Sequence, residues 1–122
     1  MRIVIIIATL FINLAIYAQE IGDVTRTDNG YTKVYDINNK IIASGYTDDN
    51  NYDCDFSSCI IVLRKDNGYT KVYDSKLKLI SSGYTEGKDY SFKVSGCNII
   101  LKNKNGYKKI YDKKLKLRTS GY

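Results

Sequence analysis

The chain has 122 residues and a formal net charge of +6, a length that allows one small domain. It contains no histidine, so Ser-His and Cys-His catalytic arrangements are excluded. Glycine-rich loops of the P-loop type are also absent from the sequence. We therefore expect a protein that is not an enzyme and that needs no cofactor.

Residues 1–18 have the pattern of a secretory signal peptide. Arg2 supplies a positive charge, residues 3–16 form an apolar run, and the small residue Ala18 precedes Gln19. The run is shorter than the roughly 20 apolar residues that a membrane-spanning helix needs. We predict cleavage after Ala18, which leaves residues 19–122 as one secreted or periplasmic domain without a membrane span.

The remaining sequence repeats at a constant interval. The segment DNGYTKVYD occurs at 28–36 and again at 66–74, and the related segment KNGYKKIYD follows at 104–112. A period of about 20–50 residues is typical of a repeated supersecondary unit. We divide the domain into three units, at about 19–47, 48–85 and 86–122.

Each complete unit contains four short segments that favour strands, and the central unit shows them best. Its strands are predicted at 51–56, 59–66, 69–74 and 79–85. Asn67-Gly68 predicts a two-residue type I′ turn, because both residues tolerate the positive φ that this turn requires. Asp74 is placed to accept backbone hydrogen bonds in the turn that follows. The first unit lacks its first strand, so we expect an all-β fold of about eleven strands.

Three tandem antiparallel meanders allow three architectures: an open blade-like array, a closed β-trefoil, or a half-propeller that dimerisation completes. Both faces of the strand at 59–66 are apolar, which predicts a strand covered on both sides. Asp23 and Thr25 stand where the central unit has Ile61 and Leu63. Polar terminal units are typical of open repeat arrays, so we favour the open array.

Charge is distributed unevenly along the chain. Residues 20–55 contain eight acidic and three basic residues, whereas residues 97–122 contain eight basic residues and one acidic residue. An acidic start and a basic end would suit head-to-tail docking of two copies in a homodimer. A charged, solvated surface is the alternative interpretation.

The segment from Tyr46 to Ile80, YTDDNNYDCDFSSCIIVLRKDNGYTKVYDSKLKLI, resembles the WG-type β-repeat. It is also similar to propeller blades of the quinoprotein kind. Thr70-Lys71 occupies the place of the Trp-Gly pair for which the repeat is named, and the chain contains no tryptophan. The resemblance extends over nearly the whole domain. It implies a β-repeat scaffold with a binding or structural role, and it carries over no functional residues.

Three cysteines are available for pairing in an exported protein, where disulfides are permitted. Cys54 and Cys59 can form a disulfide across a hairpin. A Cys59–Cys97 disulfide between two units is the alternative. Either pairing leaves one thiol, which we expect to be a small buried apolar side chain rather than a nucleophile.

The acidic connection at 48–55 contains Asp48, Asp49, Asp53 and Asp55. Such carboxylates could ligate calcium or act as the carboxylate pair of a hydrolase. The spacing lacks an ordered ligand pattern and a central glycine, and the equivalent loop at 86–92 has lost most of the acidic residues. We therefore expect a solvated connection and no metal site.

Repeated tyrosines beside lysines form the candidate ligand-binding site. An exposed aromatic face can stack on sugar rings, although the same rings can pack between units instead. The candidate ladder comprises Tyr31, Lys33, Tyr69, Lys71, Tyr107 and Lys109. We expect a non-enzymatic protein with a binding or structural role at the cell envelope or outside the cell. A carbohydrate-binding module is the second hypothesis, and the expected partner is a protein or an acidic polysaccharide rather than nucleic acid.

Overall fold

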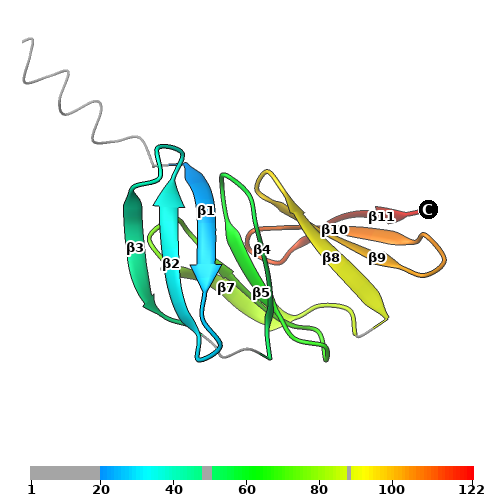
Figure 1. Ribbon diagram of the computed structural model, residues 1–122. Helices are drawn as coiled ribbons and strands as arrows, with labels where there is room; N and C mark the ends of the chain where they lie inside the picture. The colour runs from blue at the N-terminus through cyan, green and yellow to red at the C-terminus, as the bar shows by residue number, and fades with distance from the viewer. Residues whose placement is uncertain (1–19, 48–50, 88) are drawn as a thin grey trace, which may run out of the picture.

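A computed structural model describes residues 20–47, 51–87 and 89–122. This part of the chain is all-β and forms eleven strands in three antiparallel sheets, which stand side by side in chain order (Figure 1). It contains no helix that could cross a membrane. The strands are β1 (Ile21–Arg26), β2 (Tyr31–Asp36), β3 (Ile41–Tyr46), β4 (Asp53–Phe56), β5 (Ile61–Arg64), β6 (Tyr69–Tyr73), β7 (Leu79–Tyr84), β8 (Tyr90–Ser95), β9 (Asn98–Asn103), β10 (Lys108–Asp112) and β11 (Leu117–Gly121).

Each sheet is a simple meander in which consecutive strands pair. The first sheet has the order β1-β2-β3, the second β4-β5-β6-β7 and the third β8-β9-β10-β11. The predicted open array with a three-stranded first unit is therefore confirmed. The described residues form no closed barrel, so the trefoil alternative is wrong.

The Asn-Gly hairpins have three-residue loops, and the predicted two-residue type I′ turn is wrong. In the second sheet the Lys65 amide donates to the Tyr69 carbonyl at 2.9 Å, and the Gly68 amide donates to the Lys65 carbonyl at 2.9 Å. Gly68 has a φ of 94°, whereas Asn67 does not have a positive φ. This is a turn followed by a glycine bulge, the usual form of a three-residue hairpin loop. The difference arises because pairing ends at Lys65, so that Asp66 joins the loop.

The second hairpin turn of each unit depends on an aspartate, as predicted. One Asp74 carboxylate oxygen accepts the amides of Lys76 and Lys78, each at 2.9 Å. Asp36 and Asp112 accept the equivalent two amides in the other sheets, at 2.8–3.0 Å. Leu77 lies in this turn with a φ of 60°, a conformation that costs a non-glycine residue roughly 1–2 kcal/mol. Its side chain packs between the first two sheets, which offsets that cost.

The three sheets stack through two cores. We call the face of Tyr69, Lys71 and Tyr73 on β6, with its equivalents, the tyrosine face, and the opposite face, which carries Val72, the valine face. Val34 on the valine face of the first sheet packs against Ile61, Leu63 and Tyr73 on the tyrosine face of the second. The valine face of the second sheet packs in the same way on the tyrosine face of the third. All four residues of β5 are buried, which confirms the prediction of a strand covered on both sides.

The two terminal faces lack a covering sheet within the described residues. The first and third sheets lie at the two ends of the array (Figure 1). The two faces are the tyrosine face of the first sheet and the valine face of the third. Asp23 and Thr25 are exposed on the first of them, whereas Ile61 and Leu63, at the equivalent positions of the second sheet, are each 1% exposed. Polar residues thus replace apolar ones where stacking ends, as the sequence pattern predicts.

Candidate functional site

The predicted Tyr/Lys ladder is divided among three sheets and does not form one open surface. Tyr31 and Lys33 lie on the tyrosine face of the first sheet, which no described element covers. Lys71 lies between the first two sheets, 5.9 Å from the ring centroids of both Tyr52 and Tyr69. Lys109 lies on the tyrosine face of the third sheet and is therefore not part of the same surface as Lys33.

Lys109 already has a partner within the array. Its ammonium group donates to the carboxylate of Glu86, which lies in the connection between β7 and β8. This hydrogen bond raises the pKa of the lysine. Lys71 and Lys109 are thus engaged by neighbouring groups of the chain, and the ladder tyrosines are half-buried like the ladder lysines.

Each predicted tyrosine pairs across its hairpin with a second tyrosine. The ring centroids of Tyr31 and Tyr46 are 4.9 Å apart, those of Tyr69 and Tyr84 are 5.0 Å apart, and those of Tyr107 and Tyr122 are 4.9 Å apart. The distances and tilted rings are typical of favourable aromatic pairs. The second tyrosine of each pair is strongly exposed, at 72% for Tyr46, 72% for Tyr84 and 90% for Tyr122.

The exposed tyrosines lie on β3 and β7 and directly after β11, the last strand of each sheet, and they were not included in the predicted ladder. The sequence does contain a signal for them, because a second tyrosine follows each ladder tyrosine at the same interval in every unit. Since cross-strand neighbours lie on the same face of a sheet, this spacing across a hairpin could have indicated the pairs.

Other tyrosines of the repeat pack between sheets. Tyr52 and Tyr73 are 8% and 9% exposed and belong to the core between the first two sheets. Tyr111 packs against the second core, and desolvation there raises its pKa. The two interpretations of the tyrosines therefore apply to different residues: some fill the cores, and the terminal ring of each hairpin pair is open to solvent.

A buried arginine joins the second sheet to the connection that leads to the third. Arg64 is 4% exposed, and its guanidinium donates to the Thr85 hydroxyl at 3.1 Å and to the Tyr90 carbonyl at 3.2 Å. It also donates to the carbonyls of Glu86 and Gly87. Burial lowers the pKa of Arg64, yet an arginine keeps its charge in proteins. One side chain thereby ties β5, the β7–β8 connection and β8 together.

Arg26 makes the equivalent contacts one unit earlier. Its guanidinium donates to the Thr47 hydroxyl at 3.2 Å and to the Tyr52 carbonyl at 3.4 Å. Neither arginine was among the site residues predicted from the sequence, although the two occupy equivalent positions of the repeat and a third cation, Lys102, follows at the same position of the last unit. Arg26 and Arg64 fix the relative positions of the sheets and hence of the exposed tyrosines.

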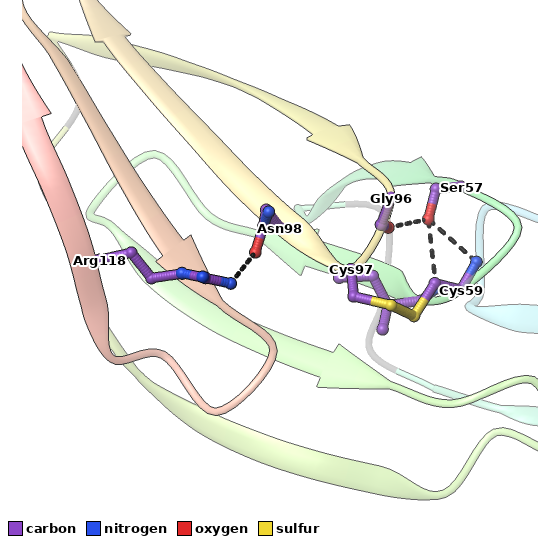
Figure 2. The surroundings of a disulfide bond; sticks show 7 residues. Ser57, Cys59, Gly96, Cys97, Asn98 and Arg118 are labelled. Carbon is purple, nitrogen blue, oxygen red and sulfur yellow. Dashed lines mark hydrogen bonds between the residues drawn. A yellow bond between two sulfur atoms is a disulfide. The ribbon is translucent and has the colours of Figure 1, made fainter.

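The disulfide joins Cys59 to Cys97, and the predicted Cys54–Cys59 pairing is wrong (Figure 2). The two cysteines occupy equivalent positions in successive units, and their Cα atoms are 5.3 Å apart. Cys54 cannot reach Cys59 because β4 and β5 pair Cys54 with Leu63. Ser57 beside the disulfide accepts the Cys59 amide at 3.1 Å and donates to the Gly96 carbonyl.

Cys54 retains its thiol on the tyrosine face of β4 and is exposed, so the prediction of a buried side chain is wrong. The reason is that β4 is an edge strand of its sheet. Although part of the residue is exposed to solvent, desolvation raises the pKa of this thiol to about 11. Two nearby charges act in opposite directions: Arg26 lowers the pKa, and Asp55 raises it. The thiol is therefore protonated near neutral pH, which makes it a poor nucleophile.

The acidic connection has a structural contact rather than a ligand site in its described part. The Asp55 carboxylate accepts the Val94 amide at 2.7 Å and so links the second sheet to the third. Residues 20–47, 51–87 and 89–122 contain no cluster of side chains suited to a metal ion. Asp48 and Asp49 lie outside the described residues.

Comparison with known proteins assigns no family: no family model matches the chain, and no curated protein matches it.

Proposed function

We propose that the protein is an exported, non-enzymatic binding protein that acts at the cell envelope or outside the cell. The signal-like pattern of residues 1–18 supports export, and so does the Cys59–Cys97 disulfide, because such bonds persist in oxidising compartments. The resemblance to WG-type repeats is in line with a binding role. The stacked sheets, joined by Arg26, Arg64 and a disulfide, provide a rigid support for surface residues.

The observation that carries the proposal is the repeated pair of tyrosines with one exposed ring. The pairs have nearly the same centroid distance in all three sheets, and each exposed ring is held by a second ring. An exposed tyrosine offers an apolar ring and a hydroxyl, a combination that suits the faces and hydroxyl groups of a sugar. Because the chain presents one such pair in each sheet, the ligand class that fits best is a saccharide chain.

Titration with hydroxyethyl cellulose, a neutral linear polysaccharide, tests this proposal. The chain has no tryptophan, so its fluorescence reports directly on tyrosine. We expect a saturable change for the wild type, and a loss of affinity of about tenfold or more when all three exposed rings are removed. The test variant is Tyr46→Ala/Tyr84→Ala/Tyr122→Ala.

A matched control is available on the same edge strands. Ile41, Leu79 and Leu117 are also exposed, at 58%, 53% and 52%, and each lies near the opposite end of its strand from the tyrosine. Ile41→Ala/Leu79→Ala/Leu117→Ala should leave the affinity nearly unchanged. Absence of any response in the wild type, or equal losses in the two triple variants, would contradict a saccharide site at the tyrosines.

A further inference from the structure

The valine face of the third sheet is strongly cationic. Strand pairing places Lys93 on β8, Lys102 on β9 and Lys108 on β10 on this face, around Ile100 and Ile110. All three lysines are exposed, and within the described part of the chain none of them pairs with a carboxylate. Lys93, Lys102, Lys108 and Ile100 line a shallow hollow of about 370 Å³.

A second basic cluster continues this face toward the β10–β11 turn. Lys113, Lys114, Lys116 and Arg118 surround a hollow of about 380 Å³ that also includes Asn98. The Arg118 guanidinium donates to the Asn98 side-chain oxygen at 3.5 Å (Figure 2). Asp112 is the acidic member of this cluster, and the turn amides already engage its carboxylate.

Several of these cations replace residues of a different kind in the repeat, whereas Lys102, Lys114 and Lys116 stand where the second unit also has a cation. Lys93 stands where the second unit has Asp55, Lys108 where it has Thr70, and Arg118 where it has Ile80. Thr70 is 0% exposed, so position 108 would be buried if another sheet covered it. A terminal face needs polar residues of any kind, and the opposite end of the array uses Asp23 and Thr25. The changes at positions 93, 108 and 118 therefore concentrate positive charge at this end of the array.

We propose that the valine face of the third sheet binds an anionic polysaccharide whose carboxylates contact these lysines. A face on which positive charge predominates attracts and orients an extended polyanion. Lys102 and Asn98 lie at opposite ends of the stretch of β9 that joins the two basic clusters, a distance of about 13 Å at roughly 3.3 Å per residue, so one chain can contact both. This surface is separate from the exposed tyrosines and goes beyond the function proposed for them.

The chemistry of the face favours a polysaccharide over other anionic partners. Single-stranded nucleic acid is usually held by bases stacked on aromatic rings. Among the described residues, strand register places no aromatic side chain on this face, although Phe92 of the opposite face borders the hollow between the lysines. Protein interfaces are depleted in lysine and enriched in aromatic residues. A second copy docked here in the manner of the internal sheets would bury Lys102 and Lys108, whose equivalents Arg64 and Thr70 are buried in the second sheet. Burial of these unpaired charges would oppose such docking.

Isothermal titration with polygalacturonate tests the proposal. We expect the wild type to bind, and we expect Lys93→Gln/Lys102→Gln/Lys108→Gln to weaken binding about tenfold or more. The control is Lys40→Gln/Lys76→Gln/Lys78→Gln, which removes the same charge from turn residues of the other two sheets and should change the affinity less than about twofold. Binding should also weaken as salt is raised, because salt screens exposed charges.

Three results would overturn the proposal: no binding of polygalacturonate by the wild type, equal losses in both lysine variants, or tighter binding of a single-stranded oligonucleotide under the same conditions. Light scattering gives a fourth test. A dimer of the wild type that the Lys93→Gln/Lys102→Gln/Lys108→Gln variant disrupts would overturn the proposal and assign the face to a second copy. The exposed-tyrosine variant should keep its affinity for polygalacturonate, so a failure of the tyrosine proposal remains distinguishable from a failure of this one.

Discussion

Replacement of Arg64 by methionine should destabilise the array strongly. The guanidinium serves four acceptors: the Thr85 hydroxyl and three main-chain carbonyls in and after the β7–β8 connection. A buried acceptor that loses its donor costs roughly 1–3 kcal/mol, and methionine retains much of the apolar stem. Because some of these carbonyls regain contact with water, we expect a loss of about 3–5 kcal/mol in the free energy of unfolding. Urea unfolding followed by circular dichroism measures this loss.

The repeat supplies a matched control for this substitution. Lys102 occupies the equivalent position in the third sheet but is exposed, so Lys102→Met should change the free energy of unfolding by no more than about 0.5 kcal/mol. The role assigned to Arg64 would be refuted by a loss below about 1 kcal/mol in Arg64→Met, or by similar losses in the two variants.

Three further changes test other parts of the fold. Gly68→Ala should be more destabilising than Gly106→Ala in urea unfolding. Both glycines have positive φ, but an added Cβ at Gly68 would collide with the Glu86 carbonyl oxygen, whereas nothing lies within 4 Å of an added Cβ at Gly106. Equal losses of stability in the two variants would argue against the collision. A Cys59→Ser/Cys97→Ser variant should lose about 4 kcal/mol of stability, because the disulfide joins distant parts of the unfolded chain; an unchanged urea midpoint would exclude the bond. Alkylation of Cys54 by iodoacetamide should be slow at about pH 8 and accelerate up to about pH 11, where the thiol ionises; a rate that levels off near pH 9 would contradict the raised pKa.

The same thiol links stability to pH. The pKa of Cys54 is raised from 9.0 to about 11 in the folded state, so the stabilising contribution of its protonated form is complete below about pH 9 and is lost as pH rises to about 11. Burial also raises the pKa of Tyr111, which acts in the same direction at alkaline pH. A Cys54→Ala variant should therefore lose less stability than the wild type between about pH 9 and pH 11.

The repeat made the sheets predictable from sequence, because nearly the same letters recur where β2, β6 and β10 form. The hairpin loop was less predictable: Asn67-Gly68 suits a two-residue turn as well as the observed loop, and the difference depends on where pairing with Lys65 ends. The disulfide could not be derived either. Cys54 and Cys59 are close in sequence, but strand register places Leu63 opposite Cys54, and sheet stacking brings Cys97 to Cys59.

The arrangement of the candidate site residues could not be derived from the sequence either, because it depends on how whole sheets stack. The repeat places Lys33, Lys71 and Lys109 at equivalent positions, which suggests a ladder on one surface. Equivalent positions in stacked sheets face the same direction, however, so each sheet covers the next one. Lys71 and Lys109 accordingly lie between sheets, where they contact Tyr52 and Glu86 in the connections that lead to β4 and β8. Alternation along one strand is readable from the sequence, whereas the order in which sheets cover one another is not.

The two ends of the array differ in a way that bears on completion of a ring by a second copy. In such a ring, the third sheet of one copy would place its valine face on the tyrosine face of the first sheet of the other copy. Internal contacts of this type bury Thr70 and Val72 on one side and Ile61 and Leu63 on the other. The terminal faces instead carry Lys108 and Ile110, and Asp23 and Thr25. Burying Lys108 and Asp23 would require their desolvation, which the attraction between two charges offsets only in good geometry. These substitutions therefore favour end faces that remain in water or bind a hydrated, charged ligand.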